Sequence, residues 1–222
     1  MRKILTCIML TFLTSTTLKA QDHTDQETVY TKNLTERAGK ILNPIQLTDS
    51  AQYKKVRGVI VAQYRNLSAV HEEKKTKLLV EKEKNESDKS IRDANLKAID
   101  EATNARLSAL HRDYIKELSA SLTKEQVDLV KNGMTYDVLN VTYKAYQDMI
   151  PSLKTKEKEQ ILTWLTEARE LAMDAGTSDG KHQIFGKYKG RINNYLSAAG
   201  YDLQRERKAW EERLKTAKSN GR

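Results

Sequence analysis

The chain has 222 residues, of which 39 are Lys or Arg and 30 are Asp or Glu, so its formal charge is +9. Its single cysteine excludes a disulfide scaffold and a zinc site built from several thiolates, and its low content of proline and glycine excludes collagen-like and low-complexity chains. The length fits one domain with a core of its own, and no internal run reaches the roughly 20 apolar residues that a membrane-spanning helix needs.

Residues 1–20 have the pattern of a secretory signal peptide. Arg2 and Lys3 give a positive start, a short apolar stretch follows, and Ala20 supplies the small residue before the cleavage point. Cys7 lies inside the apolar stretch and not at the cleavage point, so no lipoprotein anchor is predicted. We therefore expect export to the periplasm or the cell exterior. The mature chain, 21–222, is expected to form a single all-α domain without cysteine.

Residues 48–119 predict a long antiparallel helical hairpin. Apolar side chains recur every three or four residues from Tyr53 to His71 and again from Leu96 to Leu118, which is the spacing of one helical face. Between these stretches, residues 72–93 hold seven basic and seven acidic residues. We expect the turn near 85–88, solvated distal ends, and arms roughly 50 Å long at about 1.5 Å rise per residue.

Residues 122–217 predict four or five shorter, packed helices. Thr123 and Gln126 form a capping box at the start of the first helix, and Gly133 is placed to follow its end. The second helix is apolar around most of its circumference, so we expect it at the buried centre, and Pro151 ends it. Together with the hairpin, these elements predict an all-α helical bundle. The remaining helices begin at Thr155, near Ser178 and after Asp202.

The chain lacks the sequence motifs of nucleotide sites, serine-hydrolase elbows and cysteine nucleophiles, and no cofactor is predicted. His71 begins like a zinc-protease motif, but Lys75 stands where the second zinc ligand would be. If the hairpin turns near 85–88, His71 faces the region around residue 100 and not His111. No metal site is therefore predicted.

Acidic pairs leave an enzymatic interpretation open. Glycoside hydrolysis needs two carboxylates roughly 5–10 Å apart, and Asp174 with Asp179, or Asp137 with Asp148, are candidates. Because the chain has 30 acidic residues, such pairs also arise by chance.

The segment 181–201, KHQIFGKYKGRINNYLSAAGY, is the most informative for function, because it mixes four aromatic with four basic residues, one His and two Asn. Sugar sites commonly combine flat apolar rings with planar side chains that hydrogen-bond to hydroxyls. Gly186 and Gly190 each cost a helix interior roughly 1 kcal/mol relative to Ala, which indicates either a closely packed neighbour or space for a ligand. The residues that we expect at an oligosaccharide site are Trp164, His182, Lys187, Tyr188, Arg191, Asn194, Tyr195 and Trp210.

Two further observations keep alternatives open. Phe185, Tyr188, Ile192 and Tyr195 have the spacing of an ordinary core stripe, which would bury the same rings without a ligand. Residues 181–222 carry a net charge of +7, which favours an anionic partner or a solvated basic face. If the protein is exported, nucleic acid is not an expected partner, and the remaining anionic candidates are acidic polysaccharides and anionic membrane surfaces.

Four segments, 47–71, 122–153, 164–176 and 181–203, resemble a family of secreted bacterial proteins of unknown function. GKYKGRINNYLSAAGYD, residues 186–202, is the most specific of these matches. The family is described as sugar-binding and is typical of polysaccharide-degrading Gram-negative bacteria, so the resemblance implies an all-α fold and a glycan-related role. It supplies no catalytic residues. A second resemblance, to periplasmic helical stress chaperones with Leu-Thr-x-x-Gln motifs, rests only on Leu-Thr-Lys-Glu-Gln at 122–126.

The leading hypothesis is an exported, non-catalytic protein that binds an oligosaccharide or polysaccharide, with acidic oligosaccharides among the expected ligands. The first alternative is a periplasmic structural or chaperone-like helical protein, which the long charged hairpin favours. A glycan-active enzyme is the third interpretation.

Overall fold

The computed structural model describes residues 14–84, 88–219 and 221, with side chains from Gln26 onwards. Within these residues the chain forms eight α-helices and one short 3-10 turn, Asn43–Ile45, and no strand, so the predicted all-α class is confirmed. Residues 1–13 of the predicted signal peptide lie outside the described part, and export stays a prediction. The helices are α1 (Thr14–Leu42), α2 (Ser50–Glu83), α3 (Lys89–Ser119), α4 (Lys124–Met134), α5 (Val138–Met149), α6 (Thr155–Met173), α7 (Ser178–Ala198) and α8 (Leu203–Ser219).

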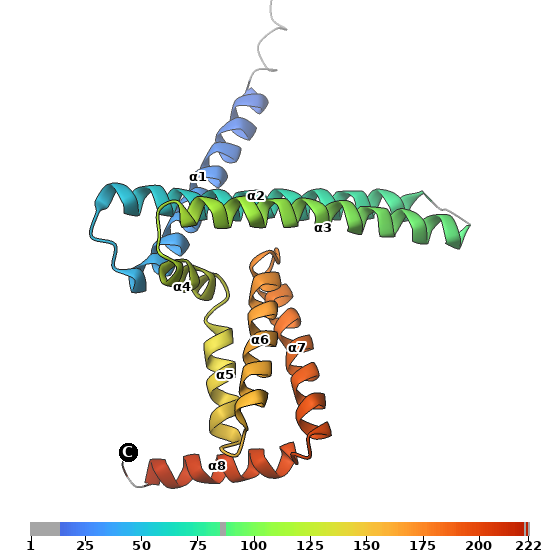
Figure 1. Ribbon diagram of the computed structural model, residues 1–222. Coiled ribbons are helices and arrows are strands. Elements are labelled where there is room, and N and C mark those ends of the chain that lie inside the picture. Colours follow the sequence, from blue (N-terminus) through green and yellow to red (C-terminus); the bar gives the residue numbers. More distant parts are fainter. Residues whose placement is uncertain (1–13, 85–87, 220, 222) are drawn as a thin grey trace, which may run out of the picture.

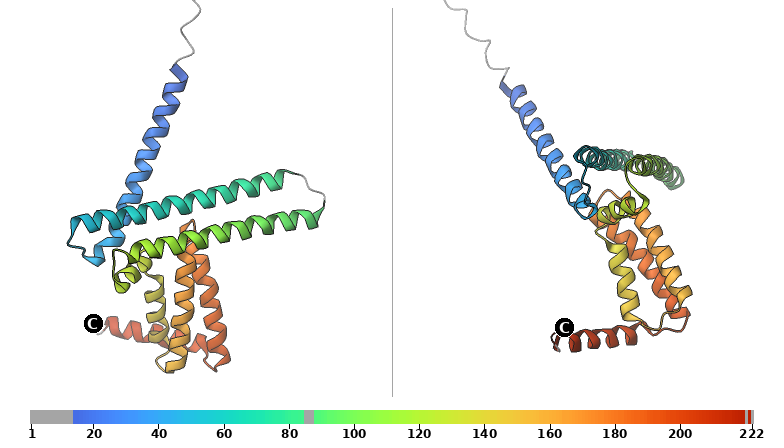
Figure 2. Two further views of the ribbon diagram at one scale, coloured as in Figure 1. Left: turned by 45° about the horizontal axis from the view of Figure 1, so that its top comes forward. Right: turned by 60° about the vertical axis from the view of Figure 1, so that its left-hand side comes forward.

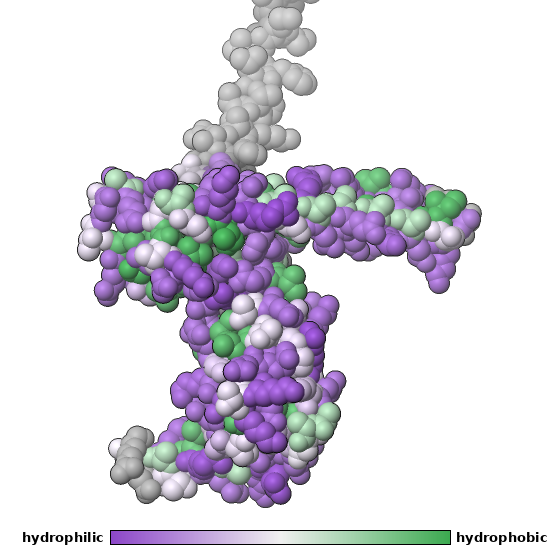
Figure 3. Space-filling model, in the orientation of Figure 1, coloured by the Kyte–Doolittle hydropathy of each residue, from purple (hydrophilic) through white to green (hydrophobic). Residues whose placement is uncertain are grey.

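The predicted hairpin is present as α2 and α3, which run antiparallel and extend beyond the rest of the molecule (Figure 1). Asp49 and Asp88 cap the two helices, since each side chain accepts a hydrogen bond from the backbone two residues on. The expected turn lies outside the described residues apart from Asp88. Ion pairs such as Lys74 with Asp100, 2.6 Å apart, join the arms, and polar side chains cover most of the distal half (Figure 3).

The proximal end of the hairpin packs against α1 and α4 around a first hydrophobic core. Ala38 and Leu42 of α1 are buried there with Ile60 of α2, Leu118 of α3 and Val130 of α4. No helix was predicted before residue 48, so α1 is a correction to the predicted element order. This helix completes the core, because it covers the side of the hairpin that would otherwise lie open.

Gly133 has a different role from the one predicted. It lies inside α4 and does not follow its end, because the helix continues to Met134. A Cβ atom at Gly133 would lie 3.0 Å from Cγ2 of Ile41, so the glycine allows α1 to approach α4 closely. The capping box of Thr123 and Gln126 at the start of α4 is confirmed.

The second core lies in a bundle of α5, α6 and α7, and its centre is α6. Ile161, Leu165 and Ala168 of α6 are fully buried, whereas Val141 of α5 is 63% exposed. The prediction that the helix before Pro151 is the buried centre is therefore wrong. Only one apolar stripe of α5 faces the core, and the stripe beside it lines a surface groove described below. The buried residues within α5 are Leu139 and Tyr146.

Helix α8 crosses the end of this bundle that is remote from the hairpin (Figures 1 and 2). Asp202 caps it, as predicted, by accepting hydrogen bonds from the backbone of Gln204 and Arg205, both at 3.1 Å. Gly200 ends α7 with a φ of 94°, a conformation that glycine adopts without steric cost. No residue of α8 is buried, so this helix covers the bundle without entering its core. None of the helices in the described ranges has the length and apolar character to cross a membrane.

Candidate functional site

Four of the predicted site residues come together on α6 and α7, in what we call the aromatic cluster: Trp164, Tyr188, Arg191 and Tyr195. The Arg191 guanidinium lies 4.3 Å from the centre of the Trp164 ring, and the Tyr195 ring meets Trp164 edge-on at 5.3 Å. Glu167 forms an ion pair with Arg191 at 3.5 Å. Tyr188 and Tyr195 also pack against the bundle core, so the cluster is half core and half surface.

The other four predicted residues do not join the aromatic cluster. His182 stacks on Tyr136 near the hairpin, with 5.9 Å between ring centres. Trp210 lies on α8 at the opposite end of the bundle, and Lys187 and Asn194 are exposed on α7. The eight residues therefore mark several separate places and not a single site.

The best-formed candidate site lies where the hairpin, α1 and the bundle meet. A hollow of about 430 Å³, which we call the junction hollow, opens between α1, α2, the α4–α5 connection and the start of α7. Its walls come from segments far apart in the sequence, which is why no local pattern predicted it. The residues that give it its chemistry are Tyr30, Arg37, Tyr64, Tyr136, Thr177 and Lys181.

The junction hollow is cationic. Arg37 and Lys181 line it, and no Asp or Glu is among its lining residues. Lys181 is only 5% exposed, and its Nζ donates to the carbonyl oxygens of Ala172 and Met173 at 3.1 and 3.4 Å. Burial lowers the pKa of Lys181 to about 8, so the group is mostly protonated at neutral pH. The hydrogen-bond acceptors of Lys181 are neutral, and the nearby Asp174 carboxylate, which is outside the lining of the hollow, offsets only part of the effect of burial on its pKa. A buried cation in this setting is a favourable place for an incoming anion.

Tyrosine rings form much of the remaining wall. The Arg37 guanidinium lies 5.3 Å from the centre of the Tyr64 ring, so the cation is held against an aromatic face. Tyr136 is 50% exposed and stacks on His182. Its backbone has a φ of 56°, and that of Asp137 has a φ of 55°. Such left-handed residues cost roughly 1–3 kcal/mol each when they are not glycine, and they cluster at functional sites.

Gly176 lets the α6–α7 connection close the wall of the hollow. A Cβ atom at this position would lie 2.7 Å from the His71 ring on α2. The same ring forms a hydrogen bond through Nε2 to the carbonyl oxygen of Asp174 at 2.8 Å. The connection is thereby fixed against the hairpin, and the start of α7 is fixed with it.

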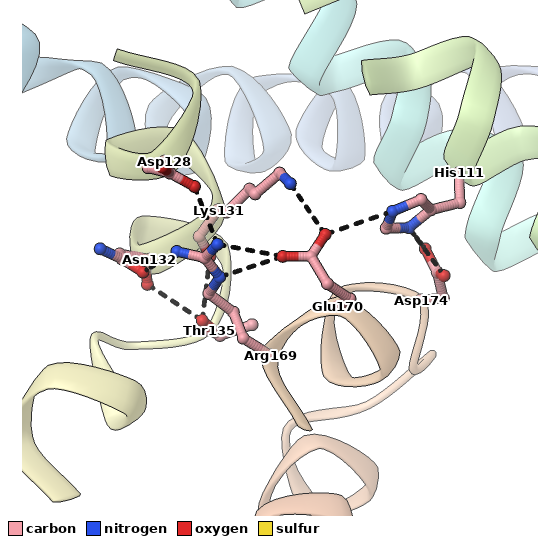
Figure 4. Close-up of polar contacts among 8 residues, drawn as sticks. All are labelled: His111, Asp128, Lys131, Asn132, Thr135, Arg169, Glu170 and Asp174. Carbon is pink, nitrogen blue, oxygen red and sulfur yellow. Dashed lines mark hydrogen bonds and ion pairs between the residues drawn. The ribbon is translucent and has the colours of Figure 1, made fainter. Parts of the chain in front are cut away.

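Beside the hollow, a network of charged side chains joins α3, α4 and α6 (Figure 4). We call it the polar joint. His111 of α3 lies between the carboxylates of Glu170 in α6 and of Asp174, which follows the end of α6, with 3.0 Å from Nδ1 to Asp174 and 3.4 Å from Nε2 to Glu170. Arg169 is bound to Asp128 at 2.8 Å, and Lys131 pairs with Glu170 at the same distance. Cations and carboxylates are matched, which favours a structural role.

The pKa values in the polar joint follow from these contacts. Hydrogen bonds with Asp174 and Glu170 raise the pKa of His111 to about 9. Burial alone would raise the pKa of Glu170, but hydrogen bonds from His111 and Lys131 outweigh it and lower the pKa to about 2. At neutral pH His111 is therefore a cation between two anions.

His71 and His111 meet at one residue without forming a metal pair. His71 binds the Asp174 carbonyl oxygen and His111 binds its carboxylate. Across the described residues, no group of three or more His, Cys, Asp or Glu is arranged to hold a metal ion. Three of the four acidic residues singled out in the sequence have polar partners: Asp174 binds His111, Asp137 accepts from Asn140 at 2.6 Å, and Asp148 pairs with a lysine one turn before it.

A second hollow, the bundle groove, has a volume of about 450 Å³ and lies between α5, α7 and α8. Trp210, one of the predicted residues, is in its wall. The residues that give it its chemistry are Tyr146, Met149, Lys189, Asn193, Arg207 and Trp210.

Residues 31–216 match the family described as "Protein of unknown function (DUF3826)". The chain belongs to this family. The match begins within α1 and ends within the last turn of α8, so it includes the polar joint, the bundle groove and, apart from Tyr30, the wall of the junction hollow. Membership in a family of unknown function was predicted and is confirmed. No curated protein matches the chain.

Proposed function

We propose that this DUF3826 member is an exported, non-catalytic carbohydrate-binding protein, and that the junction hollow takes an acidic sugar unit of an oligosaccharide. One observation carries the proposal. The hollow combines two cations and three tyrosine rings, and none of its lining residues is acidic. Rings pack against the C–H faces of a sugar, and cations hold its carboxylate through charge-assisted hydrogen bonds.

The arrangement assigns a role to each side of the hollow. Lys181 and Arg37 face a common space and would bind a carboxylate from two elements, α7 and α1. Asn33 and Ser68 also line the hollow and offer donors and acceptors for hydroxyl groups. Tyr136, exposed and held by a costly backbone conformation, would form a platform at its edge.

An uncharged sugar would satisfy these cations poorly. The Asp174 carboxylate offsets only part of the desolvation cost of the buried Lys181, and a uronate carboxylate in the hollow would offset more of it. Acid sugars are therefore expected to bind more tightly than their neutral forms. The basic character of residues 181–222 supports the same ligand class, because it attracts an anionic chain.

Calorimetry with trigalacturonate and its methyl ester tests the proposal. We expect the acid to bind, and the uncharged ester to bind with an affinity at least about tenfold lower. A hydrogen bond to a charged group contributes about 1.5–3 kcal/mol, and the ester loses this contribution. Arg37→Met and Lys181→Met should each weaken binding of the acid by a similar factor.

Arg191→Met is the matched control. Arg191 also lies over an aromatic ring, but in the aromatic cluster outside the junction hollow, so its loss should leave the affinity for trigalacturonate unchanged. Absence of heat with both ligands, or equal affinity for the acid and its ester, would contradict the proposal. A loss of binding in Arg191→Met with normal binding in the other two variants would move the site to the aromatic cluster.

A further inference from the structure

The bundle groove is separate from the junction hollow. The two share α7, but Lys181 lines the hollow whereas Lys189 and Asn193 line the groove. At about 1.5 Å rise per residue, Asn193 lies roughly 18 Å further along the helix than Lys181. One wall of the groove is α8, which lies at the end of the bundle remote from the hairpin (Figure 1).

The groove has the mixed chemistry of a saccharide site. Trp210 and Tyr146 supply rings, and Met149 adds apolar surface. The Tyr146 hydroxyl donates to Oδ1 of Asn193 at 2.7 Å, which fixes the amide plane. Among the described residues no acceptor is bound to Nδ2 of Asn193, so both of its N–H groups are free to donate to a ligand.

The charge at the groove is also positive. Lys189 and Arg207 line it, and its lining residues include no Asp or Glu. Arg207 is partly compensated by Glu211, 3.0 Å from its Nε, but Lys189 forms no ion pair within the described part of the chain. An anionic chain therefore fits this wall better than a cationic or purely apolar one.

The face of α7 beside the groove is unusually bare. Gly186 and Gly190 lie on the same helical stripe as Lys189 and Asn193, at spacings of three and four residues. A Cβ atom at either glycine would meet no other atom within 4 Å. This open space excludes close packing of another helix at Gly186 and Gly190, one of the two reasons considered for these glycines.

We propose that the bundle groove is a second saccharide-binding site, which takes an internal stretch of the same acidic chain and stacks one sugar ring on Trp210. The ligand class rests on the proposed function, but the site does not depend on the junction hollow. The hollow is the more enclosed of the two and suits a single unit or a chain end, whereas the open groove suits a chain that continues in both directions. Two sites on one elongated molecule would raise the avidity for a polysaccharide.

Tryptophan fluorescence distinguishes the two sites. The chain has two tryptophans, so Trp164→Phe leaves Trp210 as the only emitter. We expect hexagalacturonate to shift or quench the Trp210 emission. The change should persist when Lys181→Met is added, because the hollow contains no tryptophan and lies on other elements.

Stoichiometry provides the second readout. With digalacturonate, which is too short to bridge the sites, calorimetry should give two sites in the wild-type protein and one in Trp210→Ala. Lys189→Met is a milder variant and should weaken the groove site about tenfold while the hollow site is unchanged. Circular dichroism of each variant checks that α8 remains folded.

Unchanged Trp210 emission at saturating hexagalacturonate, together with a stoichiometry of one that Lys181→Met abolishes, would overturn the groove site and leave the proposed function intact. If the wild-type protein bound digalacturonate at neither site, the proposed function would be overturned instead. A Trp210 response to an apolar ligand but not to hexagalacturonate would also contradict the second site.

Discussion

At the residue scale, Lys181 decides the chemistry of the junction hollow. It is buried, its acceptors are two backbone carbonyl oxygens, and it shares the hollow with Arg37. The site was predicted in the segment that begins at this lysine, but Lys181 itself was not among the predicted residues. The reason is physical: Arg37 and the tyrosines that line the hollow with Lys181 come from α1, α2 and the α4–α5 connection, and only the folded chain brings these elements to the start of α7.

Binding of an acidic sugar should depend on pH through Lys181. Its pKa of about 8 means that the cation is lost as pH rises through 8, while a uronate stays ionised. We expect the affinity for trigalacturonate to be constant between pH 6 and 7 and to fall about tenfold by pH 9.5. Calorimetry across this range measures the effect.

Lys181→Arg is the control for this dependence, because a guanidinium stays charged throughout. The variant should remove the fall in affinity between pH 7 and 9.5. A wild-type affinity that does not change across this range would show that Lys181 does not contact the anion.

His111 in the polar joint should make stability depend on pH. Its pKa is raised to about 9 in the folded protein, above the value of about 6.5 for an unfolded histidine. The contribution of His111 to the free energy of unfolding is therefore fully present below pH 6.5 and lost as pH rises through 9. Urea unfolding from pH 6 to 8 should show this decline, because above pH 8 the depressed pKa of Lys181 changes stability in the opposite direction.

His111→Gln should reduce that slope, since the amide does not titrate. His182→Gln is the matched control, because His182 stacks on Tyr136 away from the two carboxylates. An equal slope in wild type and His111→Gln would show that the ion pairs do not contribute.

At the element scale, the hairpin followed from the sequence because each helix carries its own apolar stripe and its own cap. The stripe of α1 has the same spacing, with Leu34, Ala38 and Ile41 buried, but charged and polar residues interrupt it. The predicted position of α5 at the buried centre was wrong, because the sequence of a helix with two adjacent apolar stripes does not indicate which stripe faces the core. Burial of Leu139 and Tyr146 shows the answer, and the other stripe lines the bundle groove.

Substitution of alanine for glycine should have opposite effects on stability at two positions, Gly190 in α7 and Gly176 in the α6–α7 connection. Gly190 lies in a helix with open space beside it, so Gly190→Ala should stabilise the protein by about 1 kcal/mol. At Gly176 the new methyl group would meet the His71 ring at 2.7 Å, so Gly176→Ala should destabilise it. Thermal unfolding of both variants measures the difference. If both stabilise, the contact between the α6–α7 connection and α2 is not as close as described.

At the scale of the whole molecule, the hairpin and the bundle meet at one place (Figures 1 and 2). The polar joint fixes α3 and α4 to α6, and His71 fixes α2 to the connection that precedes α7. The junction hollow is formed by this meeting, so its shape depends on both parts. No short motif encodes such a site, whereas the family match and the all-α class could be predicted from local patterns.

A crystal structure of the protein with trigalacturonate would show whether the junction hollow holds an acidic sugar. We expect a uronate carboxylate within hydrogen-bond distance of Lys181 Nζ and the Arg37 guanidinium, with a sugar ring against Tyr136. A saccharide bound at Trp164 and Arg191, with none in the junction hollow, would contradict it.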